Sequence, residues 1–519
     1  MKLGSQRTCE GLTRSNPCGG ARGANRQRAV SGMKRAWAAA VTILFLAGAG
    51  KAQQYGAPET DTQAAAPASA SVAQGETAVN NLQNPLFGGV TSGPLTPGVM
   101  PLSLADTVHR ALQYNLALLL SSHASTAARG ARWVALSELL PHVTAGTSET
   151  VQQINLQAFG FPGFPGVPKI VGPFSVFDVR GHVSQQVFNL QDFYNARSSA
   201  ENLKAARYSY RDARDLVVLV AVDLYLEADT GASRVKAAHA EVQTAQALYQ
   251  LAVDRHKAGL AAGIDVLRAH VELEGQQQRL IYDRNEYEED KLTLERAIGI
   301  AAGQKIELTN PIRYENLPPI TLQSALARAY QMRADYKSAE AQLAAAKAGV
   351  RAARARRLPT LSFNGNYGDI GIAPGVSHGT FSVAGTLSVP LFQGGRIKGQ
   401  ELEAESLERD RQAQLANLRN QIDYEVRTAF LDMESTSQQV QVATSALTLA
   451  KEQLQQARDR FAAGVVNSLE VVQSQEALAT ADENYISSLY SNNVAKASLA
   501  RAVGGAERTV EQFLLGMSK

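Results

Sequence analysis

Two short segments carry charged residues and a glycine at the same spacing. In RHKAGLAAGIDVLRA (255–269), Arg255 is followed after four residues by Gly259 and after six more by Asp265. The segment RFAAGVVNSLEVVQS (460–474) repeats this arrangement at an offset of 205 residues, with Arg460, Gly464 and Glu470. The helix dipole stabilises an arginine in the last turn of one helix and an acid in the first turn of the next, and glycine allows a left-handed residue between them. The spacing therefore predicts two tips, each made of helix, turn and helix.

The other polar residues show no pattern of a catalytic centre. None of the eight histidines belongs to an HExxH array or another metal-binding spacing, and the chain lacks a phosphate-binding glycine motif, a GxSxG elbow and paired catalytic carboxylates. Both cysteines, Cys9 and Cys18, lie near the start, so thiol chemistry is excluded from the rest of the chain. We expect a protein that is not an enzyme and uses no cofactor or metal.

The elements that position the two tips are also duplicated. Residues 204–299 are echoed without a gap by residues 409–504 at the offset of 205, and an earlier echo, from Leu104/Leu322 to Pro141/Pro359, has an offset of 218. Such duplication predicts two copies of one large module. We assign repeat 1 to residues 102–300 and repeat 2 to residues 321–504, each with a helix, two strands and two long helices. A linker (301–320) joins them, and a C-terminal tail (505–519) follows.

Long helices lead to each tip. Residues 191–257 and 395–462 contain no proline, and returning helices are expected at 264–299 and 468–503. At ~1.5 Å per residue, the longer segments would reach on the order of 100 Å. Large and small residues alternate at spacings of three and four, as at Leu447, Ala450, Leu454 and Ala457, which is typical of a coiled-coil seam. A further helix in each repeat is expected to run unbroken to the proline that stops it, over 102–140 and 322–358.

After these prolines the period of the apolar residues changes to two. Apolar and polar residues alternate in 176–187, 361–367 and 381–391, which predicts strands with one apolar and one polar face. The lipid-facing candidates are Phe177, Val183, Val383 and Leu387, and the water-facing candidates are Arg180, His182, Asn364 and Ser382. A soluble sandwich with one buried face has the same periodicity. Four strands leave open edges that lipid does not tolerate, so in a membrane several chains must pool their strands.

The first 101 residues differ in composition from the rest. Residues 1–52 contain nine Lys and Arg against one acid, a net charge of +8, so the total of +3 leaves −5 for residues 53–519 and gives no indication of nucleic-acid binding. A basic start at Met33 and the apolar run AWAAAVTILFLAGAG predict a secretory signal peptide, with translation beginning at Met33. Residues 53–101, rich in Ala, Gln, Gly and Pro, are expected to be extended or disordered.

Both tip segments resemble the helix-turn-helix tips of TolC-like outer-membrane efflux channels. A valine follows the acid in each tip, at Val266 and Val471. The segments SVPLFQGGRIKGQ (388–400) and SQQVFNLQDFYNARSSA (184–200) are similar to the strand-to-helix junctions of that family. The resemblance covers nearly all of residues 102–504.

This resemblance implies an α+β fold in which each chain supplies four transmembrane β-strands. Three chains would close a 12-stranded outer-membrane barrel, continued by a long α-helical coiled-coil barrel across the periplasm. The implied function is that of a passive channel in a tripartite efflux or type I secretion system, gated at the tips. The implied partners are two further copies, a periplasmic adaptor (membrane fusion) protein, an inner-membrane pump and outer-membrane lipid.

The resemblance also assigns roles at the tips. Adaptor docking would involve residues of both tips: Arg255, Gly259, Asp265, Val266, Arg460, Gly464 and Val471. In the family, two acids three residues apart ring the periplasmic aperture; Glu470 matches the first, whereas Gln473 replaces the second. Glu470 can equally be an acid that stabilises the start of its helix.

Two other classes of protein remain as alternatives. A secreted structural coiled-coil protein or adhesin without a pore would have the helical heptads but no lipid-facing strands. A periplasmic enzyme is the more distant alternative, because the catalytic patterns above are missing.

Overall fold

A computed structural model describes residues 84–160, 168–310, 314–315 and 320–515 of the 519-residue chain. All of them belong to one contiguous unit, Gly75–Lys519. The predicted leader and signal peptide (1–52), both cysteines, residues 53–83 of the predicted extended segment, and residues 516–519 of the tail lie outside the described residues.

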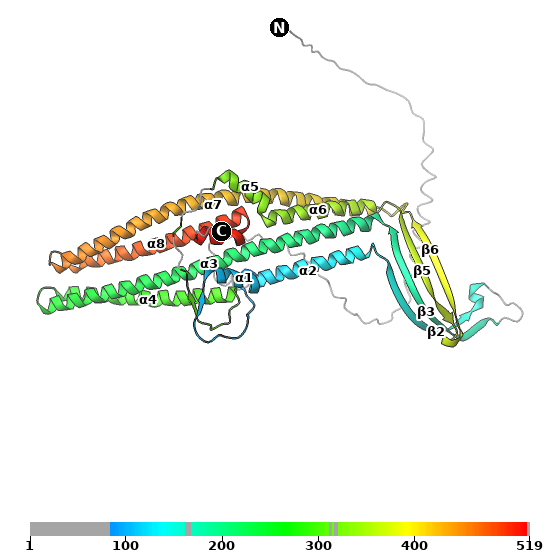
Figure 1. The fold of residues 1–519 in the computed structure, drawn as a ribbon, viewed down its shortest axis with the longest axis horizontal. Helices are drawn as coiled ribbons and strands as arrows, with labels where there is room; N and C mark the ends of the chain where they lie inside the picture. The colour runs from blue at the N-terminus through cyan, green and yellow to red at the C-terminus, as the bar shows by residue number, and fades with distance from the viewer. Residues whose placement is uncertain (1–83, 161–167, 311–313, 316–319, 516–519) are drawn as a thin grey trace, which may run out of the picture. The chain divides into compact units, whose positions relative to one another are not determined.

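Two pairs of long antiparallel helices lead to the tips (Figure 1). In repeat 1, α3 (Leu190–Lys257, 68 residues) is followed by α4 (Gly263–Ala297). In repeat 2, α7 (Arg396–Ala462, 67 residues) is followed by α8 (Ser468–Val503). These bounds confirm the four predicted helices to within two residues. No helix of the described residues has the combination of length and apolar character that a membrane crossing needs.

The predicted seam of α7 is buried over most of its length. Its buried residues follow spacings of three and four: Val440, Ala443, Leu447, Ala450, Leu454, Ala457 and Phe461. On α3 only the small positions of this seam are buried, every seven residues: Ala238, Ala245 and Ala252, the counterparts of Ala443, Ala450 and Ala457. Small side chains let neighbouring helices approach closely, as expected for a coiled-coil seam.

The helix predicted before each strand pair is in fact two helices. In repeat 1 these are α1 (Leu104–Tyr114) and α2 (Leu116–Ser137), separated at Asn115, where ψ is 133°. In repeat 2 they are α5 (Leu322–Met332) and α6 (Ala334–Ala355), separated at Arg333, where ψ is 125°. The prediction of an unbroken helix was wrong at equivalent places, since Asn115 and Arg333 differ by the offset of 218.

Tertiary partners explain both breaks. The buried Asn115 side chain caps α2 by accepting from the Ala117 amide, and its Nδ2 donates to Leu86 O (2.7 Å) and Ala297 O (3.2 Å). At the other break, Arg333 lies in a buried ion-pair network with Asp335 and Glu425. Neither break contains proline or glycine, the residues that most clearly mark the end of a helix in a sequence.

One four-stranded antiparallel sheet forms in the described residues, with the order β2-β3-β5-β6 (Figure 1). The strands are β2 (His142–Asn155), β3 (Ile170–Phe188), β5 (Thr360–Gly371) and β6 (Ser377–Ser388). Short 3-10 turns lie at Leu156–Phe159 and Pro374–Val376. Strand β6 ends before the predicted residue 391, because Pro390 has no N–H for the ladder. The pairing of β3 with β5 joins the two repeats.

A second sheet ties the start of repeat 1 to the linker. Strand β1 (Met100–Leu102) pairs in parallel with β4 (Ile306–Leu308), although these segments were expected to be extended and a plain linker. A 3-10 turn, η2 (Pro85–Phe87), precedes β1, and α9 (Ala506–Leu515) follows α8. The largest apolar cluster lies here, around the fully buried Tyr225, and includes residues of α1, α3, α8 and α9.

Candidate functional site

The first tip (residues 255–269) and the second tip (460–474) have the same backbone. Gly259 has a φ of 71° and Gly464 a φ of 77°, so both occupy the left-handed region that favours glycine. In each turn the amide after the glycine donates to the arginine carbonyl, Leu260 N to Arg255 O (2.8 Å) and Val465 N to Arg460 O (2.9 Å). The predicted helix ends at glycine are confirmed.

Arg255 reaches from the first tip to the second. Its guanidinium donates to the carbonyl oxygen of Phe461 and, at 3.4 Å, to that of Ala462. The same group lies 4.8 Å from the centroid of the Phe461 ring. Arg255 thus caps the end of α7, where carbonyl groups lack helical partners, and links the two helix pairs of the chain.

Asp265 makes a second link between the tips. Its Oδ1 accepts a hydrogen bond from the Ser468 hydroxyl at 2.6 Å, at the first residue of α8. Arg268, one turn further along α4, forms a longer ion pair with the same carboxylate at 3.7 Å. The acids and arginines of the two tips therefore do not simply repeat each other's contacts.

The ion pair of the second tip joins two residues of that same tip. Arg460 Nη1 lies 2.6 Å from Glu470 Oε1, and both side chains are partly exposed. Gln473, one turn after Glu470, is exposed. The two predicted aperture residues thus lie close together on α8, and Glu470 has a partner within its own tip.

The two valines of the motif have different surroundings. Val471 is only 2% exposed and packs with Leu454, Ala457 and Phe461 between α7 and α8. Val266 is half-buried on α4. Val471 is therefore a packing residue within this chain, whereas Val266 remains partly accessible at the surface of the first tip.

Sequence reasoning missed the partners of the first tip. Phe461 and Ser468 receive the two links, and their counterparts in repeat 1, at the offset of 205, are His256 and Gly263. Neither counterpart can play the same part, since glycine has no hydroxyl and His256 is turned to its own tip, with Nδ1 2.9 Å from Ala261 O. The sequence differences between the two tips, Phe461 in place of His256 and Ser468 in place of Gly263, were the signal from which these partners could have been predicted.

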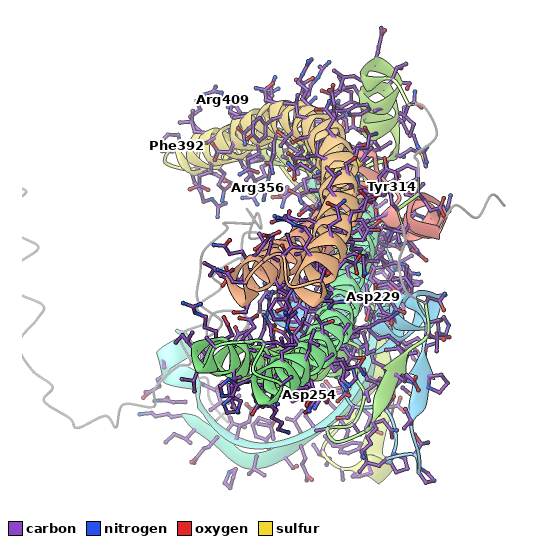
Figure 2. All side chains as sticks on the ribbon, turned by 90° about the vertical axis from the view of Figure 1, so that its left-hand side faces the viewer. Asp229, Asp254, Tyr314, Arg356, Phe392 and Arg409 are labelled. Atoms are coloured by element: carbon purple, nitrogen blue, oxygen red, sulfur yellow. The ribbon has the colours of Figure 1, made fainter. Side chains whose placement is uncertain are left out.

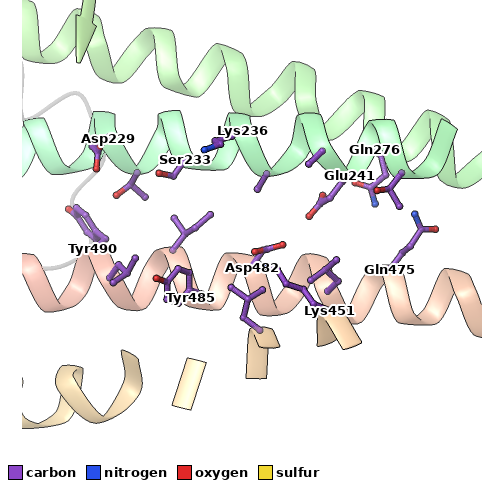
Figure 3. Close-up of a pocket in the computed structure, with 18 of the residues that line it drawn as sticks. Asp229, Ser233, Lys236, Glu241, Gln276, Lys451, Gln475, Asp482, Tyr485 and Tyr490 are labelled. Atoms are coloured by element: carbon purple, nitrogen blue, oxygen red, sulfur yellow. The ribbon is translucent and has the colours of Figure 1, made fainter. Parts of the chain in front are cut away.

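A groove of about 480 Å³ lies between the helix pairs, behind the tips. Figure 3 shows side chains of α3, such as Ser233 and Glu241, facing side chains of α8, such as Tyr485 and Asp482. Burial raises the pKa of the Glu241 carboxyl, although Arg279 partly offsets this rise. The seam predicted from the sequence includes only the apolar groove residues Leu447 and Leu454, so the sequence did not indicate a polar groove.

The strand register sorts the eight strand candidates onto two faces. Cross-strand pairs such as His182 with Asn366 and Asn366 with Ser382 place Arg180, His182, Asn364 and Ser382 on one face. On that face Arg180 donates to Asn366 Oδ1 (2.7 Å) and Thr380 Oγ1 (3.2 Å). The opposite face carries Phe177, Val183, Val383 and Leu387.

The apolar face is bare in the single chain. Its large exposed side chains come from all four strands: Val143, Val151, Val179, Tyr367, Phe381, Val383 and Leu387. Beyond β6, Leu391 and Phe392 are 93% and 90% exposed; Phe392 is labelled in Figure 2. An apolar surface of this extent indicates contact with lipid or protein.

The described residues contain no group of three or more His, Cys, Asp or Glu side chains that could hold a metal ion.

Known proteins share both the sequence pattern and the fold. The family described as outer membrane efflux protein matches residues 107–300 and 321–505. The pyoverdine export outer membrane protein OpmQ of Pseudomonas aeruginosa is 27% identical over 332 residues, which cover 61% of this chain and 67% of that protein. The probable efflux pump outer membrane protein TtgC of Pseudomonas putida is 25% identical over 351 residues, with coverages of 61% and 67%.

Solved structures agree with the fold. The CmeC outer membrane channel of Campylobacter jejuni has a TM-score of 0.68 and 18% identity, and the match covers 79% of this chain and 89% of CmeC. For the outer membrane protein VceC of Vibrio cholerae, the TM-score is 0.67 with 18% identity, and the coverages are 78% and 96%. The predicted α+β class is confirmed.

The family match decides between the alternatives raised by the sequence. It spans both repeats, including the strands that a structural coiled-coil protein would not need, so the adhesin alternative is wrong. The relatives are efflux channels and not enzymes. The chain belongs to the outer membrane efflux protein family, and it is an outer-membrane efflux channel whose helical part extends into the periplasm.

Proposed function

We propose that three copies of this chain form one passive duct, with a 12-stranded barrel in the outer membrane and a helical barrel in the periplasm. The observation that carries this proposal is the sheet. Among the described residues, β2 and β6 are edge strands with no further neighbour, while one face of the sheet is apolar. Open edges are not stable in lipid, and three sets of four strands give an even number that can close.

The polar face then lines the lumen. Arg180, His182, Asn364 and Ser382 share this face, and the hydrogen bonds of Arg180 to two neighbouring strands hold its charge there. Water in the lumen would hydrate these groups, whereas hydrocarbon would not.

The tips form the closable periplasmic mouth. Arg255 and Asp265 each bind the second tip, so both helix pairs of one chain are held together at that end. Breaking these links would free α3 and α4 to move away from α7 and α8. In a trimer Glu470 would recur three times around the mouth, and Gln473 would contribute no charge beside it.

The adaptor is proposed to dock on the outside of this mouth. Arg255, Gly259, Asp265, Val266, Arg460 and Gly464 lie at the tips, and the groove behind them has polar and apolar walls that suit a helical partner. An inner-membrane pump would supply the energy. Since OpmQ is named for pyoverdine export and TtgC for an efflux pump, we favour small-molecule efflux over type I protein secretion.

Closure between copies can be tested by cross-linking. A cysteine at Thr147 on β2 is combined with single cysteines along β6, and the protein is oxidised in mild detergent. Disulfide-linked species should end at three chains, and light scattering should give the mass of a trimer. Cysteines on β3 instead of β2 are the control, since β3 has neighbours on both sides. A monomer, or a ladder that continues beyond three, contradicts the proposal.

The assignment of the sheet faces has its own test. Val383 and Ser382 are adjacent on β6 and point to opposite faces, so Val383→Lys and Ser382→Lys form a matched pair. A lysine at the bilayer midplane costs about 2–4 kcal/mol on the lipid face. Val383→Lys should strongly reduce the amount of trimer inserted in the outer membrane, and Ser382→Lys should leave it near normal. The opposite ranking would mean that the face assigned to lipid lines the lumen and that the face assigned to the lumen contacts lipid.

A further inference from the structure

A cavity of about 640 Å³ lies beside α7 and α8, apart from the tips and the groove. Two polar residues of α8, Asn492 and Lys496, line it, and both are fully buried. Tyr314, labelled in Figure 2, lies over the Lys496 ammonium with its ring centroid 5.2 Å away, and its hydroxyl is 2.9 Å from Ser437 Oγ. Buried polar groups normally have partners, so these two residues call for an explanation.

The duplication shows what Lys496 lacks. Its counterpart in repeat 1 is Lys291, which forms an ion pair with Glu288 at 2.8 Å. The counterpart of Glu288 is Asn493, whose Oδ1 lies 3.4 Å from Lys496 Nζ. No carboxylate in the part of the chain that the structure describes forms an ion pair with Lys496. Glu315 lines the same cavity but forms no ion pair with Lys496, so the ammonium has no carboxylate of the described residues in direct contact.

The side-chain oxygen of Asn492 has no hydrogen-bond donor opposite it among the described residues. Its Nδ2 donates to Thr436 Oγ1 at 3.2 Å, but its buried Oδ1 accepts no hydrogen bond from the described residues. A buried acceptor without a hydrogen-bond donor destabilises the folded protein. A ligand that places an N–H group here would remove this destabilisation.

The rest of the cavity is apolar with a mixed charged mouth. Phe430, Leu431 and Met433 of α7 form one wall. Tyr225, the counterpart of Phe430, is fully buried beneath an extended segment and is hydrogen-bonded to Asn310, so repeat 1 has no such opening. The mouth carries two acids and one base, Glu315, Glu434 and Arg427, of which Arg427 is paired with Asp423 at 2.7 Å.

We propose that this cavity binds the free C-terminal end of an apolar peptide. The terminal carboxylate pairs with Lys496, the last amide N–H donates to Asn492 Oδ1, and the last side chain packs on Phe430, Leu431 and Met433. To reach the carboxylate, Lys496 turns from Asn493 into the cavity. Burial lowers the pKa of Lys496 to about 8 although Glu315 raises it, so an arriving carboxylate meets an ammonium that lacks a close counter-ion.

Binding can be measured on the full-length protein in detergent. The probe is fluorescein-labelled Gly-Gly-Gly-Leu with a free carboxylate, compared by anisotropy with the same peptide ending in a carboxamide. The free acid should bind at least ten times more tightly than the amide. Its affinity should also fall from pH 7 to pH 9.5, because Lys496 loses its charge above its lowered pKa.

Matched variants separate this site from general charge effects. Lys496→Met should reduce the affinity for the free acid at least tenfold, and Lys291→Met, at the counterpart in repeat 1, should leave it unchanged. Asn492→Leu should weaken binding of acid and amide alike, since both carry the last N–H. Thermal unfolding of each variant confirms that it is folded.

Several outcomes would overturn the proposal. Equal affinity for the free acid and the amide would show that the terminal carboxylate does not contribute to binding. Unchanged binding by Lys496→Met would show the same. Complete competition by millimolar acetate would reduce the site to one for a simple anion. No saturable binding, together with loss of trimer in Lys496→Met, would mean that a neighbouring copy fills the cavity.

Discussion

The first and second tips share one turn geometry but not one set of contacts. Arg255 and Asp265 of the first tip bind Phe461 and Ser468 of the second, whereas Arg460 of the second tip binds Glu470 within the same tip. The duplicated motif thus preserved the backbone, which depends on a glycine at positive φ, while the side chains acquired different partners. Equivalent positions in a duplicated protein should therefore be compared by their contacts before a shared role is assigned.

The surroundings of the two turn glycines, Gly259 and Gly464, also differ between the tips. A β-carbon added at Gly464 would lie 3.3 Å from Arg255 Nη2, whereas one added at Gly259 would have no atom within 4 Å. The second tip is therefore the receiving surface and the first tip the reaching one. Four sets of substitutions test this contrast, from the largest expected effect to the smallest.

Loss of Arg255 should have the largest effect. Arg255→Met removes hydrogen bonds from a charged donor to the end of α7, worth about 2 kcal/mol. Arg460→Met, its matched control, removes a partly exposed ion pair worth about 0–1 kcal/mol. In planar bilayers, Arg255→Met should conduct more than the parent, and Arg460→Met should change little. Equal conductance of the two variants would show that the tips are not held together by Arg255.

Bulky replacement of the two glycines should have the next largest effect. Either Gly464→Leu or Gly259→Leu forces a side chain into the left-handed region, at about 1 kcal/mol. Only Gly464→Leu also meets Arg255, so it should abolish transport while trimer yield and membrane insertion stay near normal. Gly259→Leu should retain more transport. Drug-susceptibility assays beside a blot for trimer measure both, and the reverse ranking would contradict this assignment of reaching and receiving tips.

A smaller effect is expected at Asp265. Asp265→Ala leaves the Ser468 hydroxyl without its acceptor and should cost about 1 kcal/mol. Ser468→Ala should have a similar effect, and the double variant should be no worse than either, since both remove one bond. Fully additive losses in thermal unfolding would mean that the two side chains act separately.

The smallest effect on stability is expected at Glu470, where the change should be electrical. Glu470→Gln neutralises the acid and weakens an exposed ion pair, so unfolding should shift by less than about 1 kcal/mol. If three such acids surround the mouth, conductance and block by divalent cations should both change. Recordings identical to the parent would leave Glu470 as an acid that stabilises its helix and pairs with Arg460.

The sequence predicted the parts of this molecule that depend on period and duplication. The bounds of α3, α4, α7 and α8 and the two faces of the sheet follow from spacings of 3.6 and 2. The breaks at Asn115 and Arg333 did not follow, because buried partners from distant segments impose them. For the same reason the links from Arg255 and Asp265 to the second tip were visible only once the four helices were placed together.

The pairing of β1 with β4 bears on the order in which the chain folds. Met100 pairs with Ile306, a separation of 206 residues, so the first ordered strand stays unpaired until all of repeat 1 has been made. Contacts this distant in sequence form slowly. Yet they close repeat 1 on itself, and its helices can assemble before repeat 2 arrives. The β3–β5 ladder depends on both repeats. We therefore expect a chain crossing the periplasm to acquire its first helix pair early and its sheet last, which keeps the apolar strand face from forming before the membrane can receive it.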